Sequence, residues 1–265
     1  MDNNLHLNDL NILIVEPSHT QQRIIERELN SLGLVKIDTV ESAESALEFI
    51  KTCPPDLILS AYYLTDTTGS ELLLTLREDE SNDDICFILV SSVTNIKQLD
   101  AVRQAGVVAI LPKPFSAKDL VLALKSTLNH LNPEELTLDE TDIESLKVLL
   151  VDDSPMARKY IKRTLLSMGI ENITEAENGL QAVDFLNDSL FELIVTDFNM
   201  PEMDGRELSA FVREQSNQSS IPIIMVTSEQ DKGRLAAVEK AGVSAICDKP
   251  FEPENVRQLI AQLVT

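Results

Sequence analysis

The second half of the chain alternates short apolar runs with longer amphipathic stretches. The run KVLLV at 147–151 is apolar after its lysine, as in a parallel strand that is covered on both faces. Ser154 and Pro155 then combine a capping serine with a proline at the first helical position, and this helix is expected to end near Gly169. Further strands are predicted at 172–176, 192–196, 221–226 and 244–247, and further helices near 179–188, 204–215, 231–241 and 253–264. Strands that alternate with helices in this way indicate a doubly wound α/β sheet.

The first half repeats this pattern at one constant offset. The segment RQAGVVAILPKPF, which begins at Arg103, matches EKAGVSAICDKPF, which begins at Glu239, at AG, V, AI and KPF. The same offset of 136 residues pairs Gly33 with Gly169 and the apolar run ILIV with VLLV. Because about 110 positions align without insertion or deletion, the chain is predicted to contain two copies of one fold.

The repeat sets the expected domain boundaries. Residues 9–130 are predicted to form the first domain and residues 146–265 the second. Between them, residues 131–145 contain Pro133 and six acidic residues and have no strong apolar period. We therefore expect an exposed acidic linker in this stretch.

Charge and composition exclude several classes of protein. The chain has 22 basic and 44 acidic residues, for a net charge of -22. A protein that binds DNA directly needs a basic face, and none is visible, so no nucleic-acid contact is expected. No apolar stretch approaches the roughly 20 residues that span a bilayer, and the N-terminus lacks the pattern of a secretory signal. The three cysteines are scattered and are expected to be small buried hydrophobes, which together predicts a cytoplasmic protein without membrane contact.

Five polar residues of the second copy follow its predicted strands in chain order. Asp152 and Asp153 come after the first strand, and Asp197 ends the third. Thr227 ends the fourth strand and Lys249 follows the fifth. Because the carboxyl ends of parallel strands meet at the edge where doubly wound folds bind ligands, we expect a shared pocket. Each residue alone is more simply a turn, cap or strand-end residue, but their joint placement favours a functional site.

Three carboxylates in one pocket repel one another and would raise each other's pKa. A hard cation relieves this repulsion, and Mg²⁺ prefers such oxygen ligands, although Mn²⁺ can bind the same set. A cation there could also grip a phosphate and leave one carboxylate free to attack phosphorus. Lys249 would supply a second positive charge, and Thr227 a hydroxyl donor, to the phosphoryl oxygens. These parts suit a phosphoryl-transfer site that works by positioning and electrostatics.

Four motifs of the second copy, VLLVDDS, TDFNMPEMDG, MVTSE and DKPF, are typical of one family. With them the second copy resembles, over its whole length, the response-regulator receiver domains of bacterial two-component signalling. The stretch TDFNMPEMDG is especially similar to the single-domain chemotaxis receiver. The resemblance implies, for each copy, a flavodoxin-like (βα)5 fold with a five-stranded parallel sheet.

The resemblance also implies roles for the acidic residues. Asp197 would be phosphorylated, and Asp152 and Asp153 would hold Mg²⁺ together with Asp197. The backbone carbonyl of Asn199 would be a further ligand of this ion.

Other positions carry further implications of the resemblance. Thr227 and Lys249 would contact the phosphoryl group, and a cis peptide bond would precede Pro250. Asn199 and Glu229 occupy the two variable positions that, in the family, tune hydrolysis of the phospho-aspartate.

One position departs from the family pattern. The family often places Tyr or Phe three residues before the lysine, where the ring swings inward on phosphorylation, but here that residue is Ile246. Either the coupling between threonine and this position is muted, or it uses a β-branched side chain, or Ile246 is simply a packed strand residue.

The first copy lacks most of this site. At the offset of 136, Glu16 replaces Asp152, while Pro17 and Ala61 replace the other two acids. Ser91 and Lys113 correspond to the threonine and the lysine. Ala61 has no side-chain oxygen that could accept a phosphoryl group, so the first copy resembles a pseudo-receiver that serves protein contacts.

The residues that remain in the first copy leave alternatives open. Glu16 and Lys113 could form an ion pair that replaces the cation, or Glu16 could retain weak metal binding. Asp66, in the loop after Ala61, could be a substitute acceptor, but it is more simply a turn residue.

The function expected from these features is that of a response regulator without an output domain. A histidine kinase or phosphotransfer protein would phosphorylate Asp197, and the change would switch contacts with a downstream protein or with a second copy of the chain. A phosphate sink, a phosphorelay intermediate, or a scaffold whose pseudo-receiver docks a kinase are the alternatives.

Two other classes of protein fit these residues less well. A haloacid-dehalogenase-like phosphatase would carry an acid where this chain has Asn199, and a flavodoxin would not place Asp152 and Asp153 beside a cofactor phosphate. We therefore expect no enzymatic turnover beyond self-phosphorylation and self-dephosphorylation.

Overall fold

The computed structural model describes residues 5–93, 99, 102–132, 143–228 and 241–264. The chain divides into two compact units, Met1–Asn132 and Pro133–Thr265. Within the stretch expected to be a linker, the last helix of the first unit ends at Leu131 and a short 3-10 turn covers Ile143–Ser145. Residues 133–142, and the helix predicted at 231–241 except for its last residue, lie outside the described residues.

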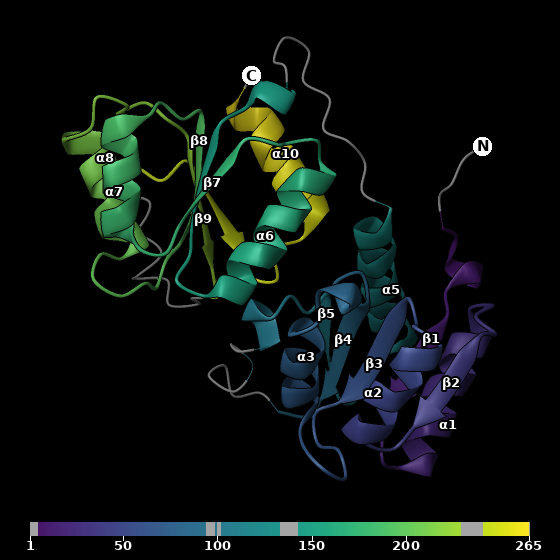
Figure 1. The fold of residues 1–265 in the computed structure, drawn as a ribbon. Helices are drawn as coiled ribbons and strands as arrows, with labels where there is room; N and C mark the ends of the chain where they lie inside the picture. The colour runs from purple at the N-terminus through teal and green to yellow at the C-terminus, as the bar shows by residue number, and fades with distance from the viewer. Residues whose placement is uncertain (1–4, 94–98, 100–101, 133–142, 229–240, 265) are drawn as a thin grey trace. The chain divides into compact units, whose positions relative to one another are not determined.

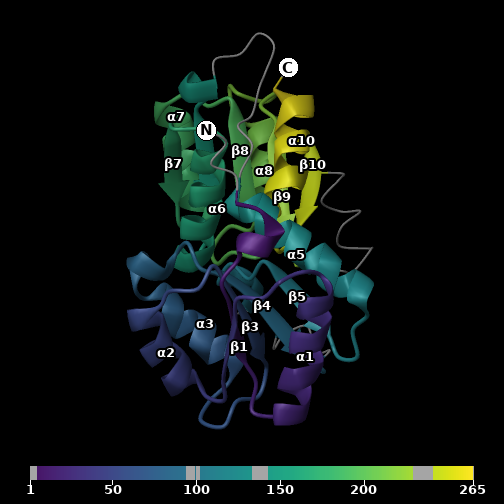
Figure 2. The same cartoon turned by 90° about the vertical axis from the view of Figure 1, so that its right-hand side faces the viewer.

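The first unit contains one parallel sheet of five strands in the order β2-β1-β3-β4-β5. Its strands are β1 (Ile12–Val15), β2 (Ile37–Val40), β3 (Leu57–Ala61), β4 (Cys86–Ser91) and β5 (Ala109–Pro112). Its described helices are α1 (His19–Ser31), α2 (Ala43–Thr52), α3 (Gly69–Arg77) and α5 (Ala117–Leu131), with 3-10 turns at Leu7–Asp9 and Glu80–Asn82. Helices α1 and α5 lie on one face of the sheet, and α2 and α3 lie on the other (Figure 2).

The second unit repeats this architecture with the strand order β10-β9-β8-β6-β7. Its strands are β6 (Val148–Val151), β7 (Ile173–Ala176), β8 (Leu193–Asp197), β9 (Ile223–Thr227) and β10 (Ala245–Asp248). Its described helices are α6 (Pro155–Ser167), α7 (Gly179–Asp188), α8 (Gly205–Glu214) and α10 (Pro253–Leu263). Helices α6 and α10 cover one face of the sheet and α7 and α8 the other (Figure 1). The prediction of two flavodoxin-like, doubly wound domains is confirmed.

Burial explains why the central strands are continuous apolar runs. Every residue of β1, β3, β4, β6, β8 and β9 is buried, because helices cover both faces of each parallel sheet. The edge strands β2 and β7 are partly exposed and carry polar residues. None of the described helices is long and apolar enough to cross a bilayer.

The cysteines correct one expectation. Cys86 and Cys247 are buried, but Cys53 is exposed. Cys53 caps the C-terminus of α2, where the chain leaves the helix toward β3, so the expectation of three buried cysteines was wrong for this residue.

A glycine brings the start of α8 against the end of β8. The amide of Gly205 donates to the carbonyl of Phe198 at 3.0 Å. A Cβ atom on Gly205 would lie 2.1 Å from the carbonyl oxygen of Asp197. The first unit has the same close approach, because a Cβ atom on Gly69 would lie 2.3 Å from the carbonyl oxygen of Ala61. The glycine therefore lets the helix pack on the strand end that carries Asp197.

We predict that Gly205→Ala lowers the free energy of unfolding of the second unit by about 2 kcal/mol, because the methyl group forces the backbone of α8 away from β8. Urea unfolding followed by the amide signals of β8 and β9 would measure this change. Arg206→Ala, at the exposed next position, should change it by less than about 0.5 kcal/mol. Equal stability of the two variants would contradict the prediction.

Candidate functional site

The three acidic residues of the second unit converge at the carboxyl edge of its sheet. Asp152 follows β6 and is completely buried, Asp197 ends β8 and is 4% exposed, and Asp153 is exposed. One carboxylate oxygen from each lies within 4.8 Å of the others. They form the one group of three potential metal ligands found among the described residues. The topology brings them together because β6 and β8 are parallel neighbours.

Local hydrogen bonds orient two of these carboxylates. The amide of Ser154, which caps α6, donates to Oδ1 of Asp152 at 2.9 Å. The amide of Asn199 donates to Oδ2 of Asp197 at 3.2 Å. Each carboxylate thus accepts from the amide two residues further along, as side chains at strand-to-loop turns commonly do.

Lys249 joins the two buried carboxylates. Its ammonium nitrogen lies 2.8 Å from Oδ1 of Asp197 and 3.1 Å from Oδ2 of Asp152. The Lys249 side chain is 5% exposed, and its amide donates to the carbonyl of Thr227 at 2.8 Å. The peptide bond between Lys249 and Pro250 is cis, as the resemblance implied. The single positive charge of Lys249 therefore faces two carboxylates in a site that is largely closed to water.

The pKa values reflect this imbalance of charge. Burial raises the pKa of Asp152 above its ordinary value, against the opposing charge of Lys249. Burial likewise raises the pKa of Asp197 to about 6, with Lys249 opposing the rise and Asp152 adding to it. Burial alone would lower the pKa of Lys249, but the charges of Asp197 and Asp152 outweigh it and hold that pKa above its ordinary value.

The donor set fits a hard divalent cation. Three carboxylates offer oxygen ligands at one point, and Lys249 balances only one of their charges. Mg²⁺ prefers oxygen ligands and retains several waters, which the exposed side of the site near Asp153 can supply. The residues therefore fit Mg²⁺, and Mn²⁺ takes the same kind of ligands.

The remaining predicted residues take different positions. Thr227 ends β9 and is 1% exposed, whereas Asn199 is exposed in the loop after β8. Ile246 on β10 is partly buried and packs against Phe198 and Met225. Glu229 lies outside the described residues.

Sequence reasoning missed Arg158. Its guanidinium donates to the carbonyl oxygen of Asp152 at 2.6 Å. The repeat could have pointed to this residue, because Gln22, 136 positions earlier, also has a side-chain donor.

Comparison with known proteins places this architecture in one family. The response regulator receiver domain matches the chain twice, over residues 12–125 and 148–261. The chain belongs to this family. It is a two-component response regulator with two receiver domains in tandem.

The similar proteins include chemotaxis proteins and the receiver domain of a sensor histidine kinase. A chemotaxis protein CheY homolog of Campylobacter jejuni is 40% identical over 121 residues, which is 45% of this chain and 92% of that protein. Chemotaxis protein CheY1 of Helicobacter pylori is 41% identical over 114 residues, which is 43% of this chain and 92% of that protein. A solved receiver domain of a Pseudomonas aeruginosa sensor histidine kinase, with a magnesium ion coordinated in its active site cleft, is 27% identical with a TM-score of 0.42 and covers 45% of this chain and 97% of its own.

The first receiver has a different arrangement at the equivalent edge. The ammonium of Lys113 lies 2.7 Å from Oε2 of Glu16, whose side chain is 6% exposed. The prediction of an ion pair between them is confirmed. Pro17 follows Glu16 in the loop, and Ala61 ends β3 at the position equivalent to Asp197. Ser91 ends β4, and its hydroxyl accepts from the amide of Val93 at 2.9 Å.

Asp66 has a structural partner in the first receiver. Its carboxylate accepts from the amides of Ala43 at 3.0 Å and Glu44 at 2.9 Å, at the N-terminus of α2. Desolvation raises the pKa of Asp66, but hydrogen bonds from backbone amides, these two among them, together outweigh it and hold that pKa below its ordinary value. This contact agrees with the simpler interpretation of Asp66 as a turn residue.

We predict that Lys113→Met destabilises the first receiver by about 2 to 3 kcal/mol, because it leaves the Glu16 carboxylate buried without its partner. Chemical denaturation followed by the amides of β1 and β5 would measure this cost. The double variant Glu16→Gln with Lys113→Met should regain most of the lost stability. Adding Mg²⁺ to the single variant should not restore it. A single variant as stable as the wild type would contradict the prediction.

The raised pKa of Asp197 predicts a pH-dependent stability of the Mg²⁺-free second receiver. A carboxyl group with a pKa of about 6 when folded and about 3.9 when unfolded binds its proton more tightly in the folded state. Its contribution to stability is complete below pH of about 4 and is lost as the pH rises through about 6.

Asp197→Asn should therefore become more stable than the wild type by about 2 to 3 kcal/mol as the pH rises from about 4 to 7 without Mg²⁺. Urea unfolding at a series of pH values would measure the difference. Asp184→Asn, at an exposed position on α7, should not develop such a difference. A constant difference for Asp197→Asn across this range would refute the prediction.

Proposed function

We propose that the second receiver accepts a phosphoryl group on Asp197 from a histidine kinase or phosphotransfer protein, and that this change switches protein–protein contacts. Receiver domains in general interact with such donors and typically bind Mg²⁺. The observation that carries the proposal is the Asp197 carboxylate, which is buried beside two other acids and 2.8 Å from the Lys249 ammonium.

The transfer itself requires an ionised Asp197. With a pKa of about 6, its carboxylate is mostly deprotonated at neutral pH and can attack phosphorus. A bond forms between this carboxylate oxygen and phosphorus, while the bond from phosphorus to the donor imidazole nitrogen breaks and leaves its electron pair on nitrogen. The product is an acyl phosphate on Asp197.

Neighbouring residues would hold the ion and the phosphoryl oxygens. Asp152, Asp153 and Asp197 would bind Mg²⁺ with the backbone carbonyl of Asn199, and the bound ion would offset the charge that gathers on the phosphoryl oxygens. Lys249 would exchange one of its carboxylate partners for a phosphoryl oxygen.

Thr227 would complete the set of donors. It ends β9, the strand next to the one that carries Asp197, and its hydroxyl would donate to another phosphoryl oxygen.

The switch would follow from the same contacts. Phosphorylation would add negative charge at Asp197, which ends β8, next to Thr227, which ends the neighbouring strand β9. The new contacts would reorganise the loops beyond β8 and β9. Ile246 on β10 packs against Phe198 and Met225 and has no aromatic ring, so the change would be transmitted by a smaller side chain. The altered surface would bind a downstream protein or a second copy of the chain.

The first receiver would act as a pseudo-receiver. Ala61 offers no side-chain oxygen, and the Glu16–Lys113 pair already supplies a positive charge for the single remaining acid. This arrangement favours a role in docking a kinase or another protein over phosphoryl transfer.

Turnover would be limited to the chain's own phosphorylation and dephosphorylation. The exposed Asn199 stands at one of the two positions that tune the lifetime of the acyl phosphate in the family, and Glu229 at the other.

We predict that incubation with acetyl phosphate and Mg²⁺ adds one phosphoryl group per wild-type chain and none to Asp197→Asn, because Asp197 is the only proposed acceptor. Intact-protein mass spectrometry would count the added groups. Asp66→Asn, in the first receiver, should be labelled like the wild type. Labelling that survives Asp197→Asn would sink the proposal, as would amide spectra of the second receiver that beryllofluoride with Mg²⁺ leaves unchanged.

A further inference from the structure

Arg158 holds the peptide group between two acidic residues of the second receiver. It lies one turn into α6, and its Nη1 donates to the carbonyl oxygen of Asp152 at 2.6 Å. This carbonyl belongs to the peptide bond that leads to Asp153. The rotation of that peptide group sets the direction in which the exposed Asp153 side chain leaves the backbone.

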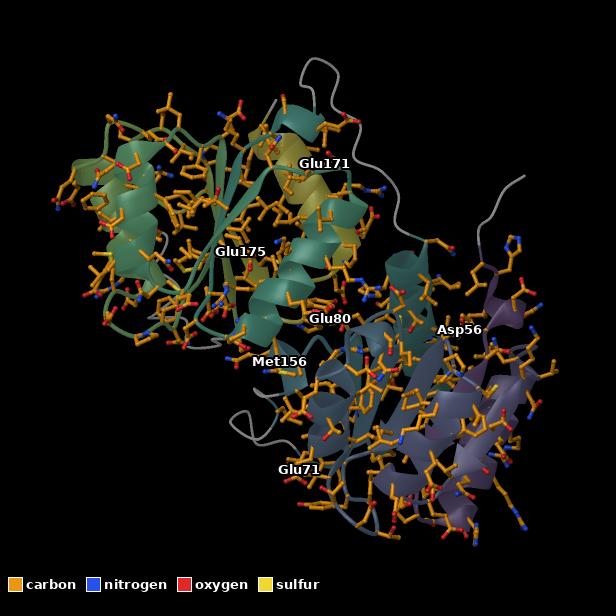
Figure 3. The ribbon with its side chains drawn as sticks, in the orientation of Figure 1. Asp56, Glu71, Glu80, Met156, Glu171 and Glu175 are labelled. Carbon is orange, nitrogen blue, oxygen red and sulfur yellow. The ribbon has the colours of Figure 1, made fainter. Side chains whose placement is uncertain are left out.

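Glu175 on the edge strand β7 and Glu177 just after it contact the guanidinium. Nε of Arg158 lies 3.7 Å from Oε2 of Glu175, and Nη2 lies 3.5 Å from Oε1 of Glu177. Figure 3 labels Glu175, which lies on β7 beside α6. The Arg158 side chain is 11% exposed, so its hydrogen bond to Asp152 is largely protected from water.

The first receiver preserves the contact with a different residue. Gln22 stands at the equivalent position of α1, and its Nε2 donates to the carbonyl oxygen of Glu16 at 2.7 Å. Glu16 is the residue equivalent to Asp152. A side-chain donor thus fixes this carbonyl in both copies, although one donor is charged and the other is neutral.

We propose that Arg158 is a positioning residue that directs the Asp153 carboxylate toward Asp152 and Asp197, and so sets the affinity of the second receiver for Mg²⁺. The inference rests on the proposed function and adds to it a residue that touches neither the ion nor the phosphoryl group. The hydrogen bond carries the effect, rather than the charge, because neutral Gln22 makes the same contact from the same place on its helix. Residues that orient metal ligands typically change metal affinity about 10- to 100-fold when they are removed.

Two substitutions separate the hydrogen bond from the charge. Arg158→Met keeps an unbranched apolar stem and removes every donor, whereas Arg158→Gln copies the solution of the first receiver. Lys162→Met is the matched control, because Lys162 lies one turn further along α6 and contacts Glu175 at 2.6 Å but not Asp152. Isothermal titration with Mg²⁺ alone gives the affinity, and thermal unfolding without Mg²⁺ reports any structural damage.

Arg158→Met should bind Mg²⁺ about tenfold more weakly than the wild type, while Arg158→Gln and Lys162→Met should stay within about threefold of it. Acetyl phosphate labelling of Arg158→Met should be slow at low Mg²⁺ and recover at saturating Mg²⁺, because Asp197, Thr227 and Lys249 are unchanged. Thermal unfolding without Mg²⁺ should differ little between Arg158→Gln and the wild type.

Wild-type affinity in Arg158→Met would overturn the inference, and so would equal losses in the Met and Gln variants, which would assign the effect to charge. A wild-type chain that binds no Mg²⁺ would overturn it as well. If the wild type binds Mg²⁺ but accepts no phosphoryl group, the proposed function fails, and the titrations still decide the role of Arg158.

Discussion

The buried ammonium group of Lys249 faces two carboxylates at the end of the second sheet, so one positive charge stands against two negative ones. The properties of the site follow from this surplus of negative charge. Asp152 and Asp197 lie 3.1 and 2.8 Å from the lysine nitrogen, so each is paired and neither is fully balanced. Burial raises the pKa of both acids. With Asp153 close by, the surplus of negative charge makes the site unfavourable by itself and receptive to a divalent cation.

The first receiver has the same fold but no surplus of buried acids over lysine at the equivalent edge. One carboxylate, Glu16, faces one ammonium, Lys113, at 2.7 Å, and Ala61 takes the place of the second acid. The strand order and the cis proline after the lysine are the same in both units. An ion pair of this kind needs no metal ion to balance its charge, so the fold of the first unit does not depend on a metal site at this edge.

Backbone contacts around the two edges have been retained even where the chemistry differs. Gly69 and Gly205 allow the same close approach of a helix to a strand end, and a side-chain donor clamps the carbonyl after the first strand of each unit. These contacts are made to backbone carbonyl groups, so both units can form them although their acidic side chains differ. The acidic side chains at this edge can therefore differ between the two units while these backbone contacts stay the same.

The sequence by itself predicted both folds, because strands buried on two faces must be apolar throughout and the repeat had one offset. It also predicted which side chains share an edge, since the carboxyl ends of parallel strands coincide, and it gave the Glu16–Lys113 ion pair as one of two alternatives. Only the tertiary structure decided that Lys249 contacts two acids, that Arg158 donates to the carbonyl of Asp152, and that Asp66 accepts hydrogen bonds from the N-terminus of α2. Such contacts join segments up to 97 residues apart, and their distances follow from helix packing and side-chain rotamers, which no local pattern encodes.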